Sequence, residues 1–450
     1  MTDVADGGEA RTLAVPELAL VVLLGASGCG KSTFARRHFS ETEVVSSDRC
    51  RAWVSDVEDD QSATSDAFEV LHLVVARRLA RGRRTVVDAT NARADARRPL
   101  LVLARRFHVP SVAVVLDLPE EECLRRNAAR PGRSVPPEVI QRQAHFVRAS
   151  TGALTREGFR AVHRIRGAAE LDATVVVRER MPANLCHEHG PFDIIGDVHG
   201  CADELDELLA LLGYTGDVPR HPDGRKAVFL GDLVDRGPGV GRVLKRVMAM
   251  VRAGGALCVP GNHDAKLVRA LRGRNVQIKN GLAESLDALA AEPPAFGASV
   301  ARFLEELPSH LVLDGGRLVV AHAGLKEHLQ GRDSGAVRSF ALFGETTGEL
   351  DELGLPIRFD WAAHYHGAAE VVYGHTPVVE PVWVNHTLNI DTGCVFGGRL
   401  SALRYPEHEL VSVAARRAYA VPRRPFVPPS PASLLFASPT VHSTEVPGGE

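Results

Sequence analysis

The feature that most constrains the fold of this chain is a glycine-rich loop placed directly after a continuous apolar run. Residues 18–24 (LALVVLL) have the composition of a buried parallel strand, and residues 25–33 (GASGCGKST) match the pattern G-x-x-x-x-G-K-[ST]. Glycines in such a loop let successive backbone N–H groups point at phosphate oxygens, and a helix predicted at 32–39 adds its positive N-terminal end. The loop therefore predicts a nucleotide phosphate site. The residues expected to form it are Gly25, Gly28, Gly30, Lys31, Ser32 and Thr33.

Individual side chains of this loop predict its chemistry. Lys31 is expected to bridge the outer phosphates of the nucleotide, and the Ser32 hydroxyl to ligate Mg²⁺. Cys29 lies inside the loop, and we expect its thiol to react with alkylating reagents because inward N–H groups favour the thiolate. The alternative is a thiol that points away from the phosphates and is inert.

Strands alternate with helices over the first part of the chain. Further apolar strands are predicted at 85–88 (TVVD) and 111–116 (SVAVVL), and helical periodicity occurs at 66–81 and 93–107. This alternation predicts an α/β fold with a parallel sheet. The expected organisation is a disordered lead-in at 1–17, a first α/β domain at 18–175, a second at 186–410 and a Pro-rich tail or linker at 411–450.

Two groups of residues in the first domain point to a phosphoryl acceptor. Asp48 is placed to take the proton of an attacking hydroxyl, and Arg51 to hold a phosphate of the acceptor. A solvated turn or helix cap is the alternative for this stretch. In the run 125–133, Arg126 and Arg130 lie on one helical face and are expected to stabilise charge on the transferring phosphoryl group. A solvated basic face is the alternative there.

The second half of the sequence holds short polar motifs that each follow an apolar strand. Carboxylate, imidazole and amide side chains in such motifs are metal ligands, and two divalent cations can activate a water and bind a phosphate between them. Asp232 is expected to bridge the two ions, with Asp197 and His199 on the first. Asn262, His322 and His375 are expected to complete the second. This mixed nitrogen and oxygen set suits Mn²⁺ and other first-row metals.

Residues beside the expected ligands have the chemistry for catalysis. His263 follows the ligand Asn262 and is expected to protonate a leaving oxygen. Asp235 is expected to orient that imidazole, and Arg236 to bind phosphate oxygens through its fork of donors.

Composition excludes several other classes of protein. The net charge of −3 argues against a protein held to nucleic acid by bulk positive potential. Seven cysteines are scattered without a C-x-x-C pair. The first ten residues lack the basic start and apolar core of a signal peptide, and no apolar run reaches the ~18 residues that span a bilayer. We therefore expect a cytoplasmic protein without a membrane partner, and the sequence leaves its oligomeric state open.

Taken together, these motifs resemble known families. The metal motifs resemble the calcineurin-like binuclear metallophosphoesterases, and residues 389–394 (NIDTGC) are similar to the diadenosine-tetraphosphatase and protein-phosphatase branch of that superfamily. The loop at 25–33, residues 47–51 (SDRCR), residues 88–91 (DATN) and the Arg126/Arg130 pair resemble P-loop polynucleotide 5′-hydroxyl kinases. In this order, the two halves resemble the bacterial polynucleotide kinase-phosphatase of RNA repair.

That resemblance implies specific activities. ATP would phosphorylate a 5′-OH polynucleotide end, with Asp48 as general base and Arg51 on the adjoining 3′-phosphate of the substrate. The phosphatase half would remove 2′- or 3′-phosphates and open 2′,3′-cyclic phosphates, and Asp391 would support the metal ligands alongside Asp235. RNA ends would be the partner, with DNA possible. The family adds a C-terminal ligase domain and an RNA 2′-O-methyltransferase partner, but this sequence contains no K-x-D-G motif. It is therefore either a fragment of a longer protein or a two-domain version, and sealing is not assigned to it.

Two other functions fit the same motifs, because these residues handle the phosphate and not the rest of the substrate. One is a small-molecule or nucleoside kinase fused to a dinucleoside-polyphosphate hydrolase. The other is a nucleotide-regulated protein phosphatase, against which the pairing of Asp48 with Arg51 counts, since a nucleotide sensor needs no acceptor base.

Overall fold

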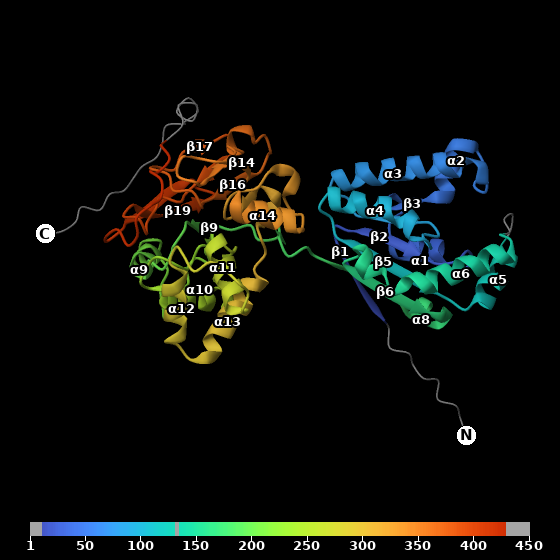
Figure 1. The fold of residues 1–450 in the computed structure, drawn as a ribbon, viewed down its shortest axis with the longest axis horizontal. Coiled ribbons are helices and arrows are strands. Elements are labelled where there is room, and N and C mark those ends of the chain that lie inside the picture. The colour runs from blue at the N-terminus through green and yellow to red at the C-terminus, as the bar shows by residue number, and fades with distance from the viewer. Residues whose placement is uncertain (1–10, 131–134, 429–450) are drawn as a thin grey trace, which may run out of the picture. The chain divides into compact units, whose positions relative to one another are not determined.

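The chain divides into two units. The computed structural model describes residues 11–130 and 135–428 (Figure 1). The first unit extends to Met181 and includes Arg332–Ser334, and the second holds Pro182–Gly331 and the residues from Gly335 onward. The boundary at Met181 falls in the gap between the two predicted domains.

The first unit is built on a parallel sheet in the order β3-β4-β2-β5-β6. The central strand β2 is buried along its whole length because helices cover both faces, which explains its continuous apolar sequence. The strands of the sheet are β2 (Leu20–Leu24), β3 (Val44–Ser46), β4 (Thr85–Asp88), β5 (Ser111–Asp117) and β6 (Ala161–Arg166). The helices are α1 (Lys31–His38), α2 (Ser47–Ser55), α3 (Thr64–Ala80), α4 (Ala94–Arg106), α5 (Glu120–Ala128), α6 (Pro137–Thr151), α7 (Leu154–Glu157) and α8 (Gly167–Ala173).

The prediction of a disordered lead-in through residue 17 is wrong for its second part. Strand β1 (Thr12–Pro16) pairs in parallel with β7 (Val175–Glu179). The side chains of Leu13 and Val15 are buried on one face of this strand. Burial of these apolar side chains stabilises the short segment as a strand. Residues 1–10 lie outside the described part of the chain.

The second unit contains two sheets. One has the order β11-β10-β9-β19-β20 and the other the order β17-β18-β16-β13-β12-β8. The strands of the first sheet are β9 (Phe192–Ile195), β10 (Lys226–Phe229), β11 (Ala256–Cys258), β19 (Arg399–Tyr405) and β20 (Glu409–Ala414). Those of the second are β8 (Asn184–Leu185), β12 (Leu311–Leu313), β13 (Leu318–Val320), β16 (Glu370–Tyr373), β17 (Trp383–Val384) and β18 (Thr387–Asn389), and a separate hairpin joins β14 (Thr346–Leu350) to β15 (Pro356–Arg358).

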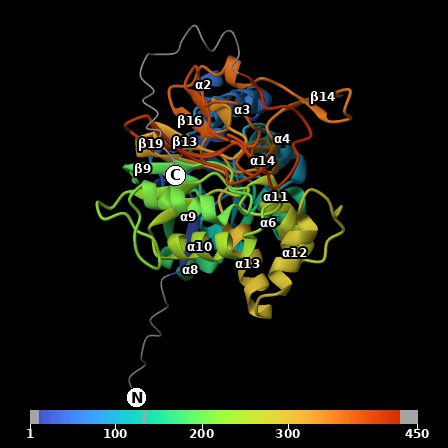
Figure 2. The ribbon, with the colours of Figure 1, turned by 90° about the vertical axis from the view of Figure 1, so that its left-hand side faces the viewer.

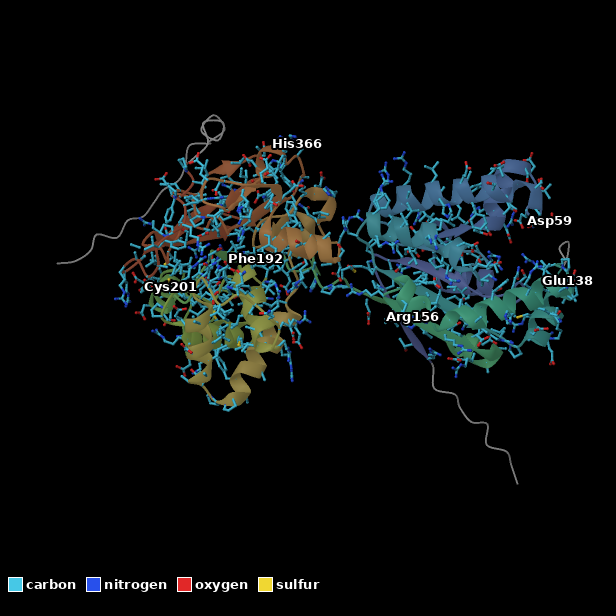
Figure 3. The ribbon with its side chains drawn as sticks, in the orientation of Figure 1. Asp59, Glu138, Arg156, Phe192, Cys201 and His366 are labelled. Atoms are coloured by element: carbon cyan, nitrogen blue, oxygen red, sulfur yellow. The ribbon has the colours of Figure 1, made fainter. Side chains whose placement is uncertain are left out.

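The two sheets share an apolar core. Phe192 and Val228 of the first sheet belong to the same buried cluster as Val320 and Val372 of the second, and Phe192 is labelled inside this unit in Figure 3. A second cluster lies on the other face of the first sheet, under helices α9 (Ala202–Leu211), α10 (Val240–Arg252), α11 (Asn262–Leu271), α12 (Leu282–Ala290) and α13 (Pro294–Glu306). Helix α14 (Gly335–Phe343) packs on the outer face of the second sheet. The α/β fold class of both halves is thereby confirmed.

The predicted tail at 411–450 is also partly wrong. Residues 409–414 form β20, which pairs antiparallel with β19, so the second sheet-forming region extends past residue 410. Val413 is buried in this pairing, which gives the segment a place in the core. The residues after 428 lie outside the described part of the chain. Among the described residues, no helix is long and apolar enough to cross a membrane.

Candidate active sites

The phosphate loop connects β2 to α1, and its glycines are required by its geometry. Gly28 and Gly30 have φ of +84° and +98°, a region that side chains rarely adopt. A Cβ atom on Gly28 would also lie 2.2 Å from the carbonyl oxygen of Cys123. The loop therefore keeps the backbone path needed to present N–H groups, and Ser32 and Thr33 follow in the first turn of α1.

Lys31 folds back over this loop. Its Nζ donates hydrogen bonds of 2.8 Å to the carbonyl oxygens of Gly25 and Ala26. The amine is therefore held where the phosphates of a nucleotide would lie, ready to exchange these carbonyls for phosphate oxygens.

Asp88 is a site residue for which the sequence analysis gave no role. It ends β4, the neighbour of β2, and its carboxylate is linked by a hydrogen bond to the Ser32 side chain. Burial raises the pKa of Asp88, and the charge of Lys31 opposes that rise. A carboxylate and a hydroxyl placed together beside a phosphate loop form oxygen ligands of the kind that Mg²⁺ prefers. The feature of the sequence that could have indicated Asp88 is its place as an acidic residue at the end of an apolar strand.

The expected acceptor residues lie together on α2. Arg51 Nη1 donates a 2.6 Å hydrogen bond to Asp48 Oδ1, and the Arg51 side chain is only 8% exposed. Arg51 Nε is buried and has no hydrogen-bond partner among the described residues. Both residues line a cavity of about 800 Å³ together with the phosphate loop and Asp88.

Arg126 and Arg130 line the same cavity from the segment around α5. Arg126 Nε donates a 2.6 Å hydrogen bond to Glu122, one turn earlier on the helix, and Nη1 remains near Gly30 of the loop. Residues 131–133 of the predicted basic run lie outside the described part of the chain. The cavity therefore collects the predicted loop, base and arginine residues in one place.

The expectation of a reactive Cys29 is wrong. Its side chain is fully buried and belongs to an apolar cluster beneath the loop. A Cβ atom on Gly25 would lie 2.3 Å from the Cys29 Sγ, so the sulfur fills the space left by that glycine. The sulfur lies 3.7 Å from Lys31 Nζ but is shielded from solvent within the core, which favours the inert alternative.

In the second unit, parallel pairing brings the metal motifs to one edge of each sheet. Ile195, Phe229 and Cys258 are in register at the ends of β9, β10 and β11. Asp197, Asp232 and Asn262 follow within a few residues, and so emerge side by side. On the other sheet, Val320 of β13 is in register with Val372 of β16, and His322 and His375 follow these strands.

The histidines present unprotonated nitrogens to a common point. His199 Nδ1 donates to the Val234 carbonyl at 2.8 Å, and His322 Nδ1 donates to the Leu230 carbonyl at 3.0 Å. In the neutral rings the Nε2 atoms therefore carry lone pairs. His322 Nε2 lies 3.0 Å from both Asn262 Oδ1 and His375 Nδ1. Acceptor atoms that converge in this way fit a shared cation.

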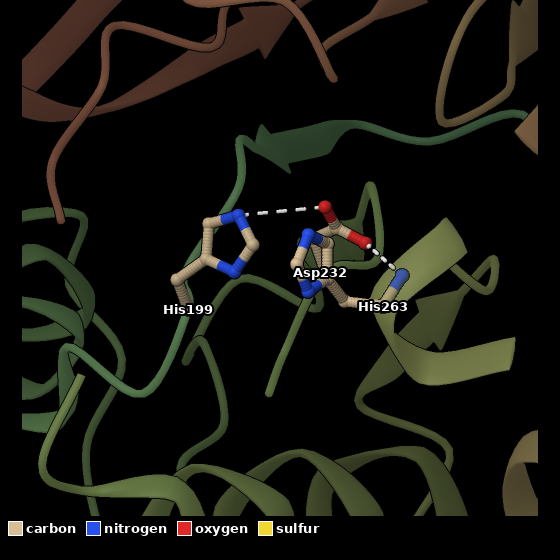
Figure 4. A group of neighbouring side chains, drawn as sticks. All are labelled: His199, Asp232 and His263. Atoms are coloured by element: carbon tan, nitrogen blue, oxygen red, sulfur yellow. Dashed lines mark hydrogen bonds and ion pairs between the residues drawn. The ribbon is translucent and has the colours of Figure 1, made fainter. Parts of the chain in front are cut away.

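Two residue groups have the spacing of metal sites. His199, Asp232 and His263 form one, and Asp232, His322 and His375 form the other, so Asp232 belongs to both groups. The first group differs from the predicted set of Asp197, His199 and Asp232, because it holds His263 in place of Asp197. Asp232 Oδ2 lies 3.4 Å from His199 Nε2 and 3.5 Å from His322 Nε2. Figure 4 shows the first group, in which Asp232 Oδ1 also accepts a hydrogen bond from the His263 backbone N–H.

Several carboxylates are buried close together in this region, which disfavours their charged forms in the absence of a cation. Burial, with the charges of Asp391 and Asp232, raises the pKa of Asp197 well above its usual range. Burial also raises the pKa of Asp391 to about 7 and lowers the pKa values of His199, His322 and His375. Burial opposes ionisation of Asp232, but the surrounding histidines lower its pKa. Divalent cations between these residues would compensate the buried carboxylates, so the residues fit the metals they were predicted to bind.

His263, Asp235 and Arg236 form a connected group beside the ligands. His263 Nδ1 donates a 2.6 Å hydrogen bond to Asp235 Oδ2, and Asp235 Oδ1 accepts one from Ser285. Arg236 contacts His263 Nε2 at 3.0 Å and His199 Nε2 at 2.6 Å, and its guanidinium lies 5.0 Å from the centre of the Phe396 ring. The orienting role predicted for Asp235 agrees with this geometry.

Backbone strain is concentrated in the same loops. Positive φ angles occur at His199 (44°), Asp232 (45°), Asp235 (71°), Arg236 (71°) and His375 (73°), where side chains other than glycine are disfavoured. Each such residue costs about 1–3 kcal/mol and persists where the surrounding structure requires it. The strain directs these side chains into one site.

Asp264 is a second residue that the sequence analysis passed over. Its carboxylate accepts hydrogen bonds from the backbone N–H groups of Leu233 (3.0 Å) and Gly261 (2.8 Å). These residues adjoin Asp232 and Asn262, so Asp264 ties the two ligand loops together. Burial raises its pKa to about 8. An acidic residue in the first turn of a helix was the signal that could have indicated it.

Two residue groups with the spacing of metal sites that share Asp232, an Asp–His pair and an arginine are the parts expected of a metal-dependent phosphoesterase, and comparison with known proteins agrees. Residues 190–389 match the model of the calcineurin-like phosphoesterases, and residues 20–149 match that of an AAA domain. The chain belongs to the calcineurin-like phosphoesterase family through its second unit, which is joined to an AAA-type, kinase-like first unit.

The names of individual relatives are more specific than the name of the family. The chain is 48% identical over 242 residues to the bis(5′-nucleosyl)-tetraphosphatase PrpE of Anoxybacillus flavithermus, an alignment that covers 52% of this chain and 99% of that protein. It is 48% identical to the PrpE protein of a Geobacillus species, over 50% of this chain and 95% of that protein. A solved structure of a candidate diadenosine tetraphosphatase is 28% identical, with a TM-score of 0.39, over 52% of this chain and 97% of that one.

Proposed function

We propose that the second unit hydrolyses phosphate esters and anhydrides of nucleotides, with dinucleoside polyphosphates as its substrate class, and that the first unit transfers a phosphoryl group from ATP to a hydroxyl. The convergence of His199, Asp232, Asn262, His322 and His375 carries the hydrolytic half of this proposal. The names of the relatives support the substrate class.

In the hydrolytic site each residue has a distinct part. Asp197, His199 and Asp232 would hold one divalent cation, and Asp232, Asn262, His322 and His375 a second. When bound, such a pair of cations would supply an activated water and charge neutralisation for in-line displacement. Arg236 binds non-bridging phosphate oxygens, and its position against two imidazoles fixes it over the site. Asp235 accepts the proton on His263 Nδ1 in a hydrogen bond, so His263 would act as an acid only as an imidazolium, with a second proton on Nε2 that passes to the leaving oxygen.

In the kinase-like unit, the cavity places donor and acceptor groups together. Lys31 moves from the loop carbonyls to the outer phosphates of ATP, and Ser32 with Asp88 would hold Mg²⁺. Asp48 accepts the proton of the attacking hydroxyl, and Arg126 and Arg130 stabilise the charge of the transferring group.

A second candidate is favoured by one observation. The buried Arg51 guanidinium lines the cavity beside Asp48, and its Nε lacks a hydrogen-bond partner among the described residues. This arrangement suits an acceptor with a phosphate next to its hydroxyl, as at a 5′-OH polynucleotide end. The second unit would then remove 2′- and 3′-phosphates from RNA ends. The same proposal includes DNA ends as possible substrates, and a methyltransferase and a ligase module as possible partners.

One experiment separates the two candidates. The protein is incubated with Mn²⁺ and either diadenosine tetraphosphate or a 3′-phosphorylated oligoribonucleotide, and with Mg²⁺–ATP and either a nucleoside or a 5′-OH oligonucleotide. Products are resolved by chromatography, with Asp232→Ala and Lys31→Ala as controls. Release of nucleoside mono- and triphosphate from the tetraphosphate supports the first candidate. Failure to cleave it, together with end-healing of the oligonucleotides, overturns the first candidate in favour of the second.

A further inference from the structure

A segment of the second unit that carries no predicted site residue packs directly on the metal loops. Trp361 is buried, and a Cβ atom on Gly324 would lie 1.9 Å from its indole ring, so the ring occupies the space above that glycine. Ala323 donates a 2.7 Å backbone hydrogen bond to Ala341 at the end of α14. Both contacts involve the residues directly after the ligand His322.

The same segment contacts the other histidine loop of the second metal group. The rings of Trp361 and Tyr373 lie 5.1 Å apart between centroids, and Tyr373 precedes Gly374 and the ligand His375. Trp361 therefore links the segment to both histidine loops, and places its neighbours in the chain beside the metal site.

The β14–β15 hairpin directly precedes the segment of Trp361 in the chain, and its loop projects from the unit in Figure 2. A 2.9 Å hydrogen bond from the Phe359 backbone N–H to Glu345 closes the root of the hairpin. We call Phe343, Arg358, Phe359, His364 and Lys326 the hairpin root. The side chains of Phe343 and Phe359 are 45% and 39% exposed, respectively.

The aromatic side chains of the hairpin root form a stacked, cationic surface. Phe359 and His364 are stacked, with centroids 5.2 Å apart and planes at 30°, and His364 Nδ1 donates to the Asp360 carbonyl at 3.0 Å. Lys326 Nζ lies 5.4 Å from the Phe359 ring centre and is held by a 2.6 Å ion pair with Glu345. Exposed stacked rings beside fixed cations are the elements that bind nucleobases and their phosphates.

Arg358 adds a further positive charge next to these rings. It is in the hairpin root next to Phe359, and its Nη1 donates to the Phe343 carbonyl. A Cβ atom on Gly344 would lie 3.7 Å from Arg358 Nη1 and 3.8 Å from the carbonyl oxygen of Ala323, so the guanidinium lies near the residue that follows His322. A guanidinium at this position is suited to a phosphate next to the one that is cleaved.

We propose that the hairpin root is a nucleoside-binding subsite of the phosphoesterase, in which a base stacks on the Phe359–His364 pair and Arg358 binds an adjacent phosphate. This subsite rests on the proposed function, in which the substrate is a nucleotide, and it assigns a binding position to the nucleoside of that substrate. It also explains why large apolar groups are exposed at this edge of the unit and why Trp361 anchors them to both histidine loops.

The test compares substrates with and without a nucleoside. Kinetics are measured with p-nitrophenyl phosphate, a nucleoside monophosphate and diadenosine tetraphosphate. Phe359→Leu keeps an apolar side chain but removes the aromatic face, and Phe359→Trp retains that face. Leu353→Ala is the matched control, since Leu353 is 63% exposed between β14 and β15. Thermal unfolding checks that each variant folds.

We expect Phe359→Leu to raise KM for both nucleotides by roughly tenfold, with unchanged kinetics toward p-nitrophenyl phosphate. Phe359→Trp and Leu353→Ala should behave as the parent protein, and Arg358→Gln should affect the tetraphosphate more than the monophosphate. Equal effects of Phe359→Leu on all three substrates, or no effect on any, would overturn the subsite. Failure of the parent protein to cleave the tetraphosphate refutes the substrate class alone, because the monophosphate still reports on the subsite.

Discussion

Adding a single methyl group at Gly374 should disable the metal site without unfolding the protein. A Cβ atom there would lie 2.2 Å from Asp197 Oδ1 and 3.3 Å from Asp391 Cβ, whereas real Cβ contacts do not fall below 3.0 Å. The Asp197 carboxylate must therefore move by about 0.8 Å, from 2.2 to 3.0 Å, and the Asp391 side chain limits the movement of the loop itself. A misplacement of about 1 Å at a reacting centre can cost about 10²-fold in rate.

We therefore expect Gly374→Ala to lower kcat/KM for p-nitrophenyl phosphate by about 100-fold, equivalent to about 2.7 kcal/mol. The overpacking itself should lower the free energy of unfolding by about 1–3 kcal/mol, which leaves the protein folded. The assays are hydrolysis at saturating Mn²⁺, bound metal per chain and thermal unfolding. Gly297→Ala is the control, because that glycine lies in α13 with nothing within 4 Å of the added methyl. Activity and metal content of Gly374→Ala within twofold of the parent would refute this reasoning.

Three further outcomes follow from the site geometry. Lys31→Ala should abolish ATP-dependent phosphorylation and leave hydrolysis intact, while Asp232→Ala should do the reverse, as measured by separate product assays; loss of both activities from either change would contradict two independent sites. Extended dialysis against a chelator should abolish hydrolysis, and Mn²⁺ should restore it, whereas full activity after dialysis would exclude the metal mechanism. N-ethylmaleimide should leave Cys29 unmodified in the folded protein, because its side chain is fully buried, and peptide mass analysis showing its rapid modification would contradict the placement of that thiol.

The sequence predicted the elements that depend on local pattern. Strands were expected at 85–88 and 111–116, and the structure has β4 and β5 at these positions. Continuous apolar runs identify buried parallel strands because both faces of such a strand are covered. The motifs after these strands could be read as ligands since the carboxyl ends of parallel strands meet at one edge, and the register of Ile195, Phe229 and Cys258 places them there.

Pairing partners that are distant in the sequence were not predictable in the same way. The local sequence of residues 12–16 does not identify a strand, and their partner β7 lies about 160 residues later in the chain. Residues 409–414 likewise form a strand by pairing with β19. A short segment gains its stability from the partner that covers it, and the local sequence does not name that partner.

By itself, the sequence determined which residues could handle phosphate and metals, because glycine conformation, imidazole and carboxylate chemistry and strand periodicity are local properties. The tertiary structure decided which way side chains point and what covers them. It placed the Cys29 side chain in the core and brought Asp88 to Ser32. It also joined the loops of Leu233 and Gly261 through Asp264, and packed Trp361 against the loops that carry His322 and His375. Most of these contacts join residues far apart in the chain, so their geometry is fixed by tertiary packing and hydrogen bonds and not by local sequence.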